Sequence, residues 1–147
     1  MDARLRATAV GAGVLALDQV SKALVRANVA PGSRDGVLPG VDLVNTRNTG
    51  VAFSLFQDGG AVLIVFTIVA MMAVVVFFLS RPDRPGAWLP TGLLLGGAAG
   101  NLIDRVRDGG VTDFIDLPRW PAFNVADMAI TVGVVVLLFV LERRSDG

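Results

Sequence analysis

The chain has 147 residues, a formal net charge of zero, and 53% hydrophobic residues, and it contains no histidine, cysteine or tyrosine. These absences exclude a serine–histidine triad, a thiol nucleophile and almost every type of zinc site. The balanced charge gives no basic surface for nucleic acid, and the high apolar content favours a membrane protein.

Four apolar segments are long enough to cross a membrane as helices. Residues 61–79 and 87–103 carry no charged side chain, whereas residues 7–25 and 122–141 are equally apolar but contain a few polar groups. About 20 helical residues cross the hydrocarbon core of a bilayer. The sequence therefore predicts a mainly α-helical membrane protein of one domain, with four spans.

The arginines predict the orientation of these spans. One group clusters close to the span ends at the two termini and in the 80–86 connection, and consists of Arg4, Arg6, Arg81, Arg84, Arg143 and Arg144. The remaining arginines are more widely spread, with Arg26 just after the first span and the others in the two longer connections. Because positive charge close to span ends favours the cytoplasmic side, we expect both termini in the cytoplasm.

The two longer connections are expected on the outer side of the membrane. Residues 28–60 are rich in Gly, Pro, Asn and Asp, and residues 41–55 have the β-branched and aromatic content of strands, which predicts a small extramembrane β-element. Residues 105–121 are predicted to form a loop with a turn at Gly109–Gly110, and Trp120 is expected at the membrane interface.

Polar residues gather at the predicted outer ends of the spans. Asp18 and Lys22 are four residues apart in the first span, in the order that favours a helical ion pair. The others are Asn101, Asp104 and Arg105 at the end of the third span, Asp113 in the connection, and Asn124 and Asp127 at the start of the fourth. Their common depth predicts a single site.

Each of these groups also has a structural interpretation. Asp18 and Lys22 would neutralise each other, Asp104 and Arg105 would form an interfacial pair, and the asparagines would join helices through hydrogen bonds. Asp127 is harder to explain in this way, because it lies in an apolar helix without a cation adjacent in sequence. Two neighbouring aspartates, such as Asp113 and Asp127, share one proton, and such a pair can hydrolyse an amide with water.

Five motifs in chain order resemble those of the lipoprotein signal peptidases, also called signal peptidase II. They are LDQVSK (17–22), NTGVAF (48–53), GNLIDR (100–105), VTDFID (111–116) and FNVAD (123–127). The resemblance runs from the first span to the last. Its departures are small, with Val51 where alanine is frequent, Thr112 where valine is common, and a short connection between Asp113 and Asn124.

This resemblance implies a multi-pass aspartic endopeptidase of the bacterial inner membrane. It would cleave signal peptides from prolipoproteins, N-terminal to a cysteine that carries diacylglycerol, with Asp113 and Asp127 as the catalytic dyad. Asn48, Asn101, Arg105 and Asn124 would position the substrate, and Asp18, Lys22 and Asp104 would support the site. The family fold implies a β-cradle and a periplasmic helix within residues 28–60. No metal or organic cofactor is implied, the partners are the lipidated substrate and membrane lipid, and a monomer is expected.

Three other interpretations remain open from the residues alone. A serine–lysine protease would use Lys22, the only lysine, with Ser54, since Ser21 points about 100° away from Lys22 on a helix. A proton or ion pathway would use intramembrane carboxylates such as Asp127, although inverted repeats are absent. Residues 1–27 also have some features of a cleavable signal peptide, but Asp18 and Lys22 interrupt the apolar run.

Overall fold

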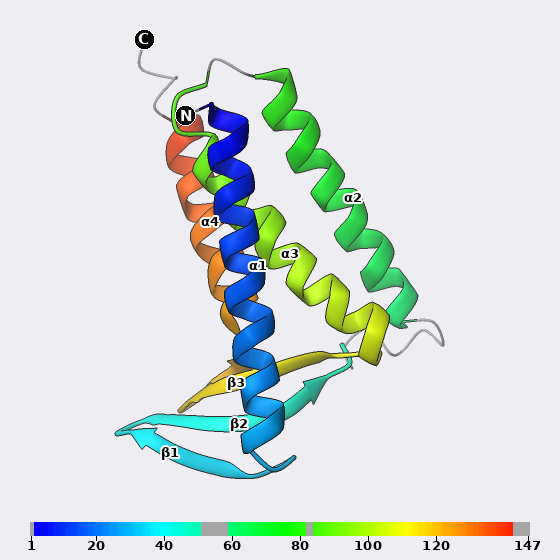
Figure 1. The fold of residues 1–147 in the computed structure, drawn as a ribbon, viewed down its shortest axis with the longest axis vertical. Helices are drawn as coiled ribbons and strands as arrows, with labels where there is room; N and C mark the ends of the chain where they lie inside the picture. The colour runs from blue at the N-terminus through cyan, green and yellow to red at the C-terminus, as the bar shows by residue number, and fades with distance from the viewer. Residues whose placement is uncertain (1, 51–58, 82–83, 143–147) are drawn as a thin grey trace.

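The computed structural model describes residues 2–50, 59–81 and 84–142. In chain order the elements are α1 (Ala3–Asn28), β1 (Arg34–Leu38), β2 (Val41–Asn48), α2 (Gly59–Ser80), α3 (Trp88–Asp108), β3 (Val111–Leu117), β4 (Trp120–Phe123) and α4 (Val125–Glu142). The helices run lengthwise, and the strands lie at one end of them (Figure 1). The predicted fold class, mainly helical with a small β-element, is confirmed.

The start of α1, the end of α2, the start of α3 and the end of α4 lie toward the end opposite the sheet (Figure 1). There Arg84 donates hydrogen bonds to the carbonyl oxygens of Val140 (3.1 Å) and Leu141 (2.9 Å) in the last turn of α4. Within the described residues, α1 therefore starts and α4 ends on the same side, as predicted. Which side of a membrane this end faces stays a prediction.

Within the part of the chain that the structure describes, three helices are long and apolar enough to cross a membrane: Ala3–Asn28, Gly60–Ser80 and Val125–Glu142. The fourth predicted span corresponds to α3, which is less apolar because it contains several glycines and polar residues and ends with four charged residues, Asp104, Arg105, Arg107 and Asp108. α3 contacts each of the other three helices, so most of its surface faces protein. A central helix needs fewer apolar side chains than one that faces lipid on most sides. The placement of α3 across the membrane stays a prediction.

Glycines let α3 approach its neighbours at backbone distance. A Cβ atom on Gly96 would lie 2.5 Å from the carbonyl oxygen of Gly11 in α1, and one on Gly97 would lie 2.6 Å from that of Ala126 in α4. Small residues at a helix–helix contact favour close packing of membrane helices. This packing brings α1 and α4 to two faces of α3 and fixes the depth of their polar residues relative to one another.

The four strands form one antiparallel sheet in the order β1-β2-β3-β4. β3 pairs with β2 in a register that places Asp113 opposite Thr46 and Val111 opposite Asn48. The prediction of a loop for residues 105–121 was wrong, because α3 continues to Asp108 and two strands follow. The strand character of β3 depends on pairing with β2, which is distant in sequence.

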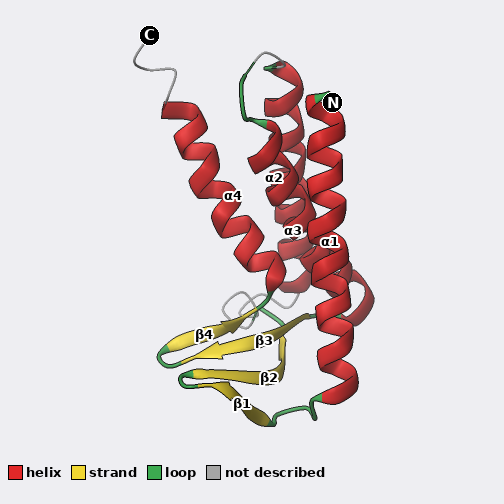
Figure 2. Cartoon of the chain, turned by 60° about the vertical axis from the view of Figure 1, so that its left-hand side comes forward, coloured by secondary structure: helices red, strands yellow, loops and turns green. Residues whose placement is uncertain are grey.

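The sheet is attached to the bundle by a small apolar core of Val25, Val29 and Phe114, with Leu43, Ile115 and Val125 packed around it. Both hairpin turns, β1–β2 and β3–β4, extend to the side away from α1 (Figure 2). Trp120 begins β4 directly after the second turn and is 65% exposed. The periplasmic helix expected within residues 28–60 stays a prediction, because residues 51–58 of that segment lie outside the described residues.

Candidate active site

Asp127 lies in the first turn of α4 and is held there by Asn124. The backbone N–H of Asp127 donates to Asn124 Oδ1 (2.9 Å), and the backbone N–H of Asn124 donates to Asp127 Oδ2 (3.2 Å). This reciprocal arrangement is a capping box, formed where an Asn-x-x-Asp sequence precedes an apolar run. The local sequence therefore fixes both the start of α4 and the direction of the Asp127 carboxylate.

Asp113 reaches the same place from β3. Its Oδ1 accepts a hydrogen bond from Asn124 Nδ2 (2.7 Å), and its Oδ2 accepts one from Asn48 Nδ2 (3.1 Å). Asp113 is only 3% exposed. Burial raises the pKa of Asp113 to about 6, and the neighbouring charge of Asp127 acts in the same direction. The hydrogen bonds from Asn48 and Asn124 oppose this rise in part. Asn124 thus contacts both carboxylates, one through its side chain and one through its backbone.

A buried ion cluster lies behind these two aspartates. Lys22 Nζ is 2.8 Å from Asp18 Oδ2 and 2.9 Å from Asp104 Oδ2, and all three side chains are fully buried. Gln19 donates to the same two carboxylates, at 3.2 Å and 3.0 Å. Such a cluster is tolerated in an interior because every charge has partners, and removing one partner of a buried pair typically costs about 3–5 kcal/mol.

Asn101 connects the ion cluster to the aspartates. Its Oδ1 accepts hydrogen bonds from Lys22 Nζ (3.0 Å) and Asn124 Nδ2 (3.2 Å), and its Nδ2 donates to Asp127 Oδ1 (2.9 Å). Since Lys22 can only donate, the oxygen of Asn101 must face it and the amide nitrogen must face Asp127. The cation therefore sets the orientation of the amide that contacts Asp127.

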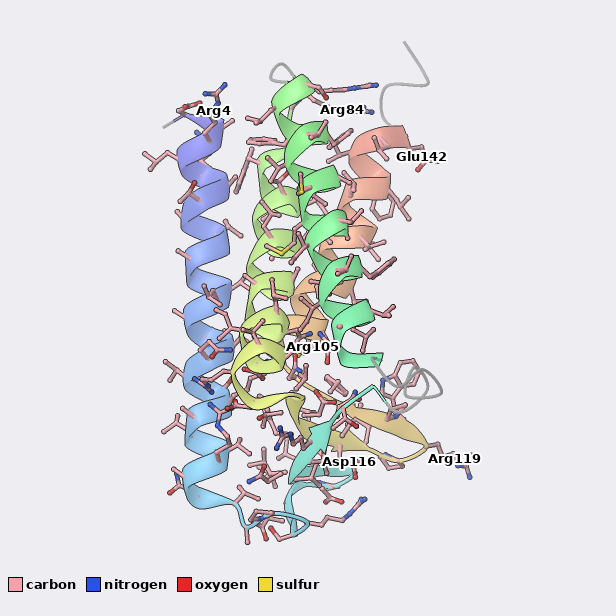
Figure 3. All side chains as sticks on the ribbon, turned by 90° about the vertical axis from the view of Figure 1, so that its right-hand side faces the viewer. Arg4, Arg84, Arg105, Asp116, Arg119 and Glu142 are labelled. Carbon is pink, nitrogen blue, oxygen red and sulfur yellow. The ribbon has the colours of Figure 1, made fainter. Side chains whose placement is uncertain are left out.

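The structure brings together most of the residues predicted for the site. Asp18, Lys22, Asn48, Asn101, Asp104, Asp113, Asn124 and Asp127 belong to one hydrogen-bonded network. Arg105 lies at the sheet end of α3, at the same end as Asp116 and Arg119 and far from Arg4, Arg84 and Glu142 (Figure 3). It is half-buried, and its predicted contact with substrate stays a prediction.

One structural interpretation is corrected and two contributing residues were missed. Asp104 does not form an interfacial pair with Arg105, because its carboxylate is fully buried and binds Lys22. The missed residues are Gln19 and Thr112. The Gln19 side chain donates to Asp104 Oδ1 (3.0 Å), and the backbone N–H of Thr112 donates to Asp104 Oδ2 (3.2 Å). The position of Gln19, next to Asp18 in an apolar segment, was a signal that could have indicated its role.

The geometry argues against a serine–lysine protease. The Lys22 Nζ contacts the carboxylates of Asp18 and Asp104 and the amide oxygen of Asn101, so its three N–H donors are already engaged by groups other than a serine hydroxyl. The Ser21 hydroxyl donates to the Asp18 carbonyl oxygen (2.9 Å) instead of approaching Lys22. Ser54 lies outside the described residues.

Comparison with known proteins assigns the family. Residues 10–142 match the family model described as signal peptidase (SPase) II. The chain belongs to the signal peptidase II family. Membership makes it a membrane peptidase of the hydrolase class, and the resemblance inferred from the five motifs is confirmed.

Members of the family from two bacteria match over most of the chain. The lipoprotein signal peptidase of Moorella thermoacetica is 44% identical over 130 residues, which are 87% of each protein. That of Solibacter usitatus is 40% identical over 154 residues, covering 97% of this chain and 93% of the relative. A solved structure of a bacterial membrane enzyme superposes with a TM-score of 0.86 at 30% identity, covering 92% of this chain and 91% of that one.

Proposed function

We propose that the chain is an intramembrane aspartic endopeptidase with Asp113 and Asp127 as its catalytic dyad. Its substrates are diacylglyceryl-modified prolipoproteins, which it cleaves N-terminal to the lipidated cysteine. The observation that carries this proposal is that Asn124 bonds both carboxylates, one buried on β3 and one in the first turn of α4. Family membership supports the substrate, since the relatives from M. thermoacetica and S. usitatus are lipoprotein signal peptidases.

The environments of the two aspartates support different roles. Asp113 is almost fully buried, and its pKa is raised to about 6, which makes its protonated form far more populated near neutral pH than that of an ordinary aspartate. Asp127 accepts two N–H donors at the N-terminal end of α4, where the helix dipole stabilises an anion. We therefore assign Asp113 as the general acid and Asp127 as the general base.

In the proposed reaction, Asp127 takes a proton from water and the resulting hydroxide attacks the scissile carbonyl carbon. Asp113 donates its proton to the carbonyl oxygen, which gives a tetrahedral diol. When the diol collapses, Asp127 returns its proton to the leaving amine, the C–N bond breaks, and a diol hydroxyl returns a proton to Asp113. The dyad ends in its starting protonation state.

The position of the dyad supports a substrate held at the membrane surface. Asp127 lies where the sheet meets α4, and the exposed apolar side chains of Met128 and Val132 continue from it along that helix. A signal peptide helix and two acyl chains would remain in lipid there while the scissile bond reaches the carboxylates. Asn48, Asn101, Arg105 and Asn124 would hold the peptide backbone in an extended form. This orientation requires the sheet end on the outer face of the inner membrane, with both termini in the cytoplasm.

The test uses purified protein in detergent with a diacylglycerated precursor and its unlipidated form. Asp113→Asn and Asp127→Asn should each lower the cleavage rate by at least about a hundredfold, since general acid–base groups contribute that much or more. Asp116→Asn is the matched control, because Asp116 lies on the same strand and pairs with Arg34 away from the dyad. Wild-type cleavage by a folded dyad variant overturns the catalytic assignment, and equal cleavage of the unlipidated precursor overturns the substrate.

A further inference from the structure

Two buried aspartates outside the dyad bind the backbone immediately beside it. Asp104 Oδ2 accepts a hydrogen bond from the backbone N–H of Thr112 (3.2 Å), and Asp18 Oδ1 accepts one from the backbone N–H of Ala126 (2.9 Å). Thr112 directly precedes Asp113, and Ala126 directly precedes Asp127. Each aspartate of the dyad therefore has its own buried carboxylate, which binds the backbone N–H of the preceding residue.

Lys22 joins these two anchoring carboxylates at 2.8 Å and 2.9 Å, and Gln19 joins them a second time. A chain of side-chain contacts thus joins β3 to α4, running from Thr112 through Asp104, Lys22 and Asp18 to Ala126. Its three charged side chains are fully buried, so water does not screen their interaction. Along the chain, the same two points are joined only through the β3–β4 hairpin.

We propose that Asp18, Lys22 and Asp104 are positioning residues that fix the separation of Asp113 and Asp127. We refer to these three residues as the ion brace; its role rests on the proposed function of the dyad. Proton sharing between two carboxylates depends steeply on their distance, and a small misplacement of catalytic groups lowers the rate strongly. The ion brace holds the backbone at both positions and, through Asn101, also directs an amide toward Asp127.

The composition of the cluster supports positioning over simple attachment of helices. Joining α1 to α3 would need one carboxylate for Lys22, and a neutral pair is cheaper to bury than a cluster with an excess negative charge. Here two carboxylates meet one ammonium, and each carboxylate has a second acceptor contact at the backbone next to the dyad. A role in positioning accounts for the second carboxylate.

The principal test is Asp104→Asn, measured with saturating diacylglycerated precursor. This variant keeps the Asp18–Lys22 pair and retains an oxygen for the Thr112 N–H, so it is expected to fold. It weakens the link to Lys22, and kcat should fall by about ten- to a hundredfold with KM changed less than about twofold. Asp104→Ala, which also loses the acceptor, should have a lower kcat than Asp104→Asn. Asp108→Asn, in the last turn of the same helix and paired with Arg107 at the surface, is the matched control.

A second variant separates positioning from stability. The triple substitution Asp18→Asn, Lys22→Met and Asp104→Asn conserves volume and removes every buried charge of the ion brace. Neutralising a buried cluster as a whole is often tolerated, so the thermal midpoint should stay within several degrees of wild type while kcat falls. A folded triple variant with wild-type kcat overturns the proposal, and so does an increase in KM at unchanged kcat for Asp104→Asn.

The same assay distinguishes failure of the ion brace from failure of the proposed function. If Asp113→Asn and Asp127→Asn are inactive while the ion-brace variants keep wild-type kcat, the dyad stands and the ion brace is refuted. If a folded dyad variant is fully active, the catalytic assignment and the role of the ion brace fall together. A lowered kcat in both sets, with normal kcat in Asp108→Asn, supports both.

Discussion

Asn124 and Asp127 exchange hydrogen bonds between side chain and backbone, at 2.9 Å and 3.2 Å, while the Asn124 amide also bonds Asp113 at 2.7 Å. One asparagine therefore begins α4 and contacts both aspartates of the proposed dyad. Helix capping and the proposed catalysis make different demands on it, since a cap needs only an acceptor, whereas Asp113 needs a donor.

This difference predicts that two substitutions of Asn124 will differ in their effect on stability but share an effect on catalysis. Asn124→Ala should lower the stability by about 1 kcal/mol through loss of the cap, whereas Asn124→Ser keeps a capping oxygen and should change it by less. Both remove the amide donor to Asp113, and both should lower kcat by at least about tenfold. Thermal unfolding and precursor cleavage in the same detergent measure the two effects. Full activity of Asn124→Ser would show that the amide is dispensable.

The raised pKa of Asp113 predicts how cleavage depends on pH. If Asp113 must hold a proton, its active fraction falls as pH rises above about 6, and kcat/KM should decrease by about tenfold for each further pH unit. The Asn48 hydrogen bond lowers the pKa of Asp113, so Asn48→Ala should move this alkaline limb to higher pH. The apparent values belong to the coupled pair, and the shift between variants is the readout.

A suitable control for the pH experiment is Asn45→Ala on the same strand. Asn45 donates to the Val29 carbonyl oxygen (2.8 Å), and among the described residues its side chain makes no hydrogen bond to Asp113 or Asp127. Its alkaline limb should coincide with that of the wild type. A limb that moves to lower pH in Asn48→Ala would contradict the assignment of Asp113 as the acid.

The close contact of α3 with α1 predicts strong sensitivity at Gly96. A Cβ there would lie 2.5 Å from the Gly11 carbonyl oxygen, a backbone atom that can move only with its helix. Gly96→Ala should therefore destabilise the protein by about 1–3 kcal/mol. Gly13→Ala is the matched control, because a Cβ at Gly13 meets nothing within 4 Å, and its effect should stay within about 1 kcal/mol. Equal unfolding midpoints for the two variants would refute the close packing.

Trp120 is expected at the outer surface of the inner membrane, where the indole ring and its N–H find a mixed apolar and polar environment. Trp120 is 65% exposed beside a hairpin turn, so replacing it should barely change folding. In a Trp88→Phe variant, Trp120 is the single tryptophan. In liposomes its fluorescence should be quenched more by lipids brominated near the headgroup than by lipids brominated near the chain end. The reverse order would place it deeper than expected.

Much of the fold could be predicted from the sequence because helices in membranes are encoded locally. Residues 61–79 predicted α2 (Gly59–Ser80) closely, since a charge-free apolar run has few alternatives. The loop predicted for 105–121 was wrong because α3 extends through Asp108 and β3 is stabilised by partners about 65 residues away, such as Thr46 for Asp113. Local content could not indicate that pairing.

The sequence by itself determined the apolar helices, the capping box at Asn124, the absence of histidine and cysteine chemistry, and the family, because these depend on residue type and short spacing. Only the tertiary structure decided that Asp104 pairs with Lys22 instead of Arg105, and that Asp18 and Asp104 bind the backbone beside the two proposed catalytic aspartates. Those contacts join residues up to 108 positions apart. They exist because glycine-rich packing of α3 against α1 and α4 brings charges of different elements into one dry interior, where each must find a partner.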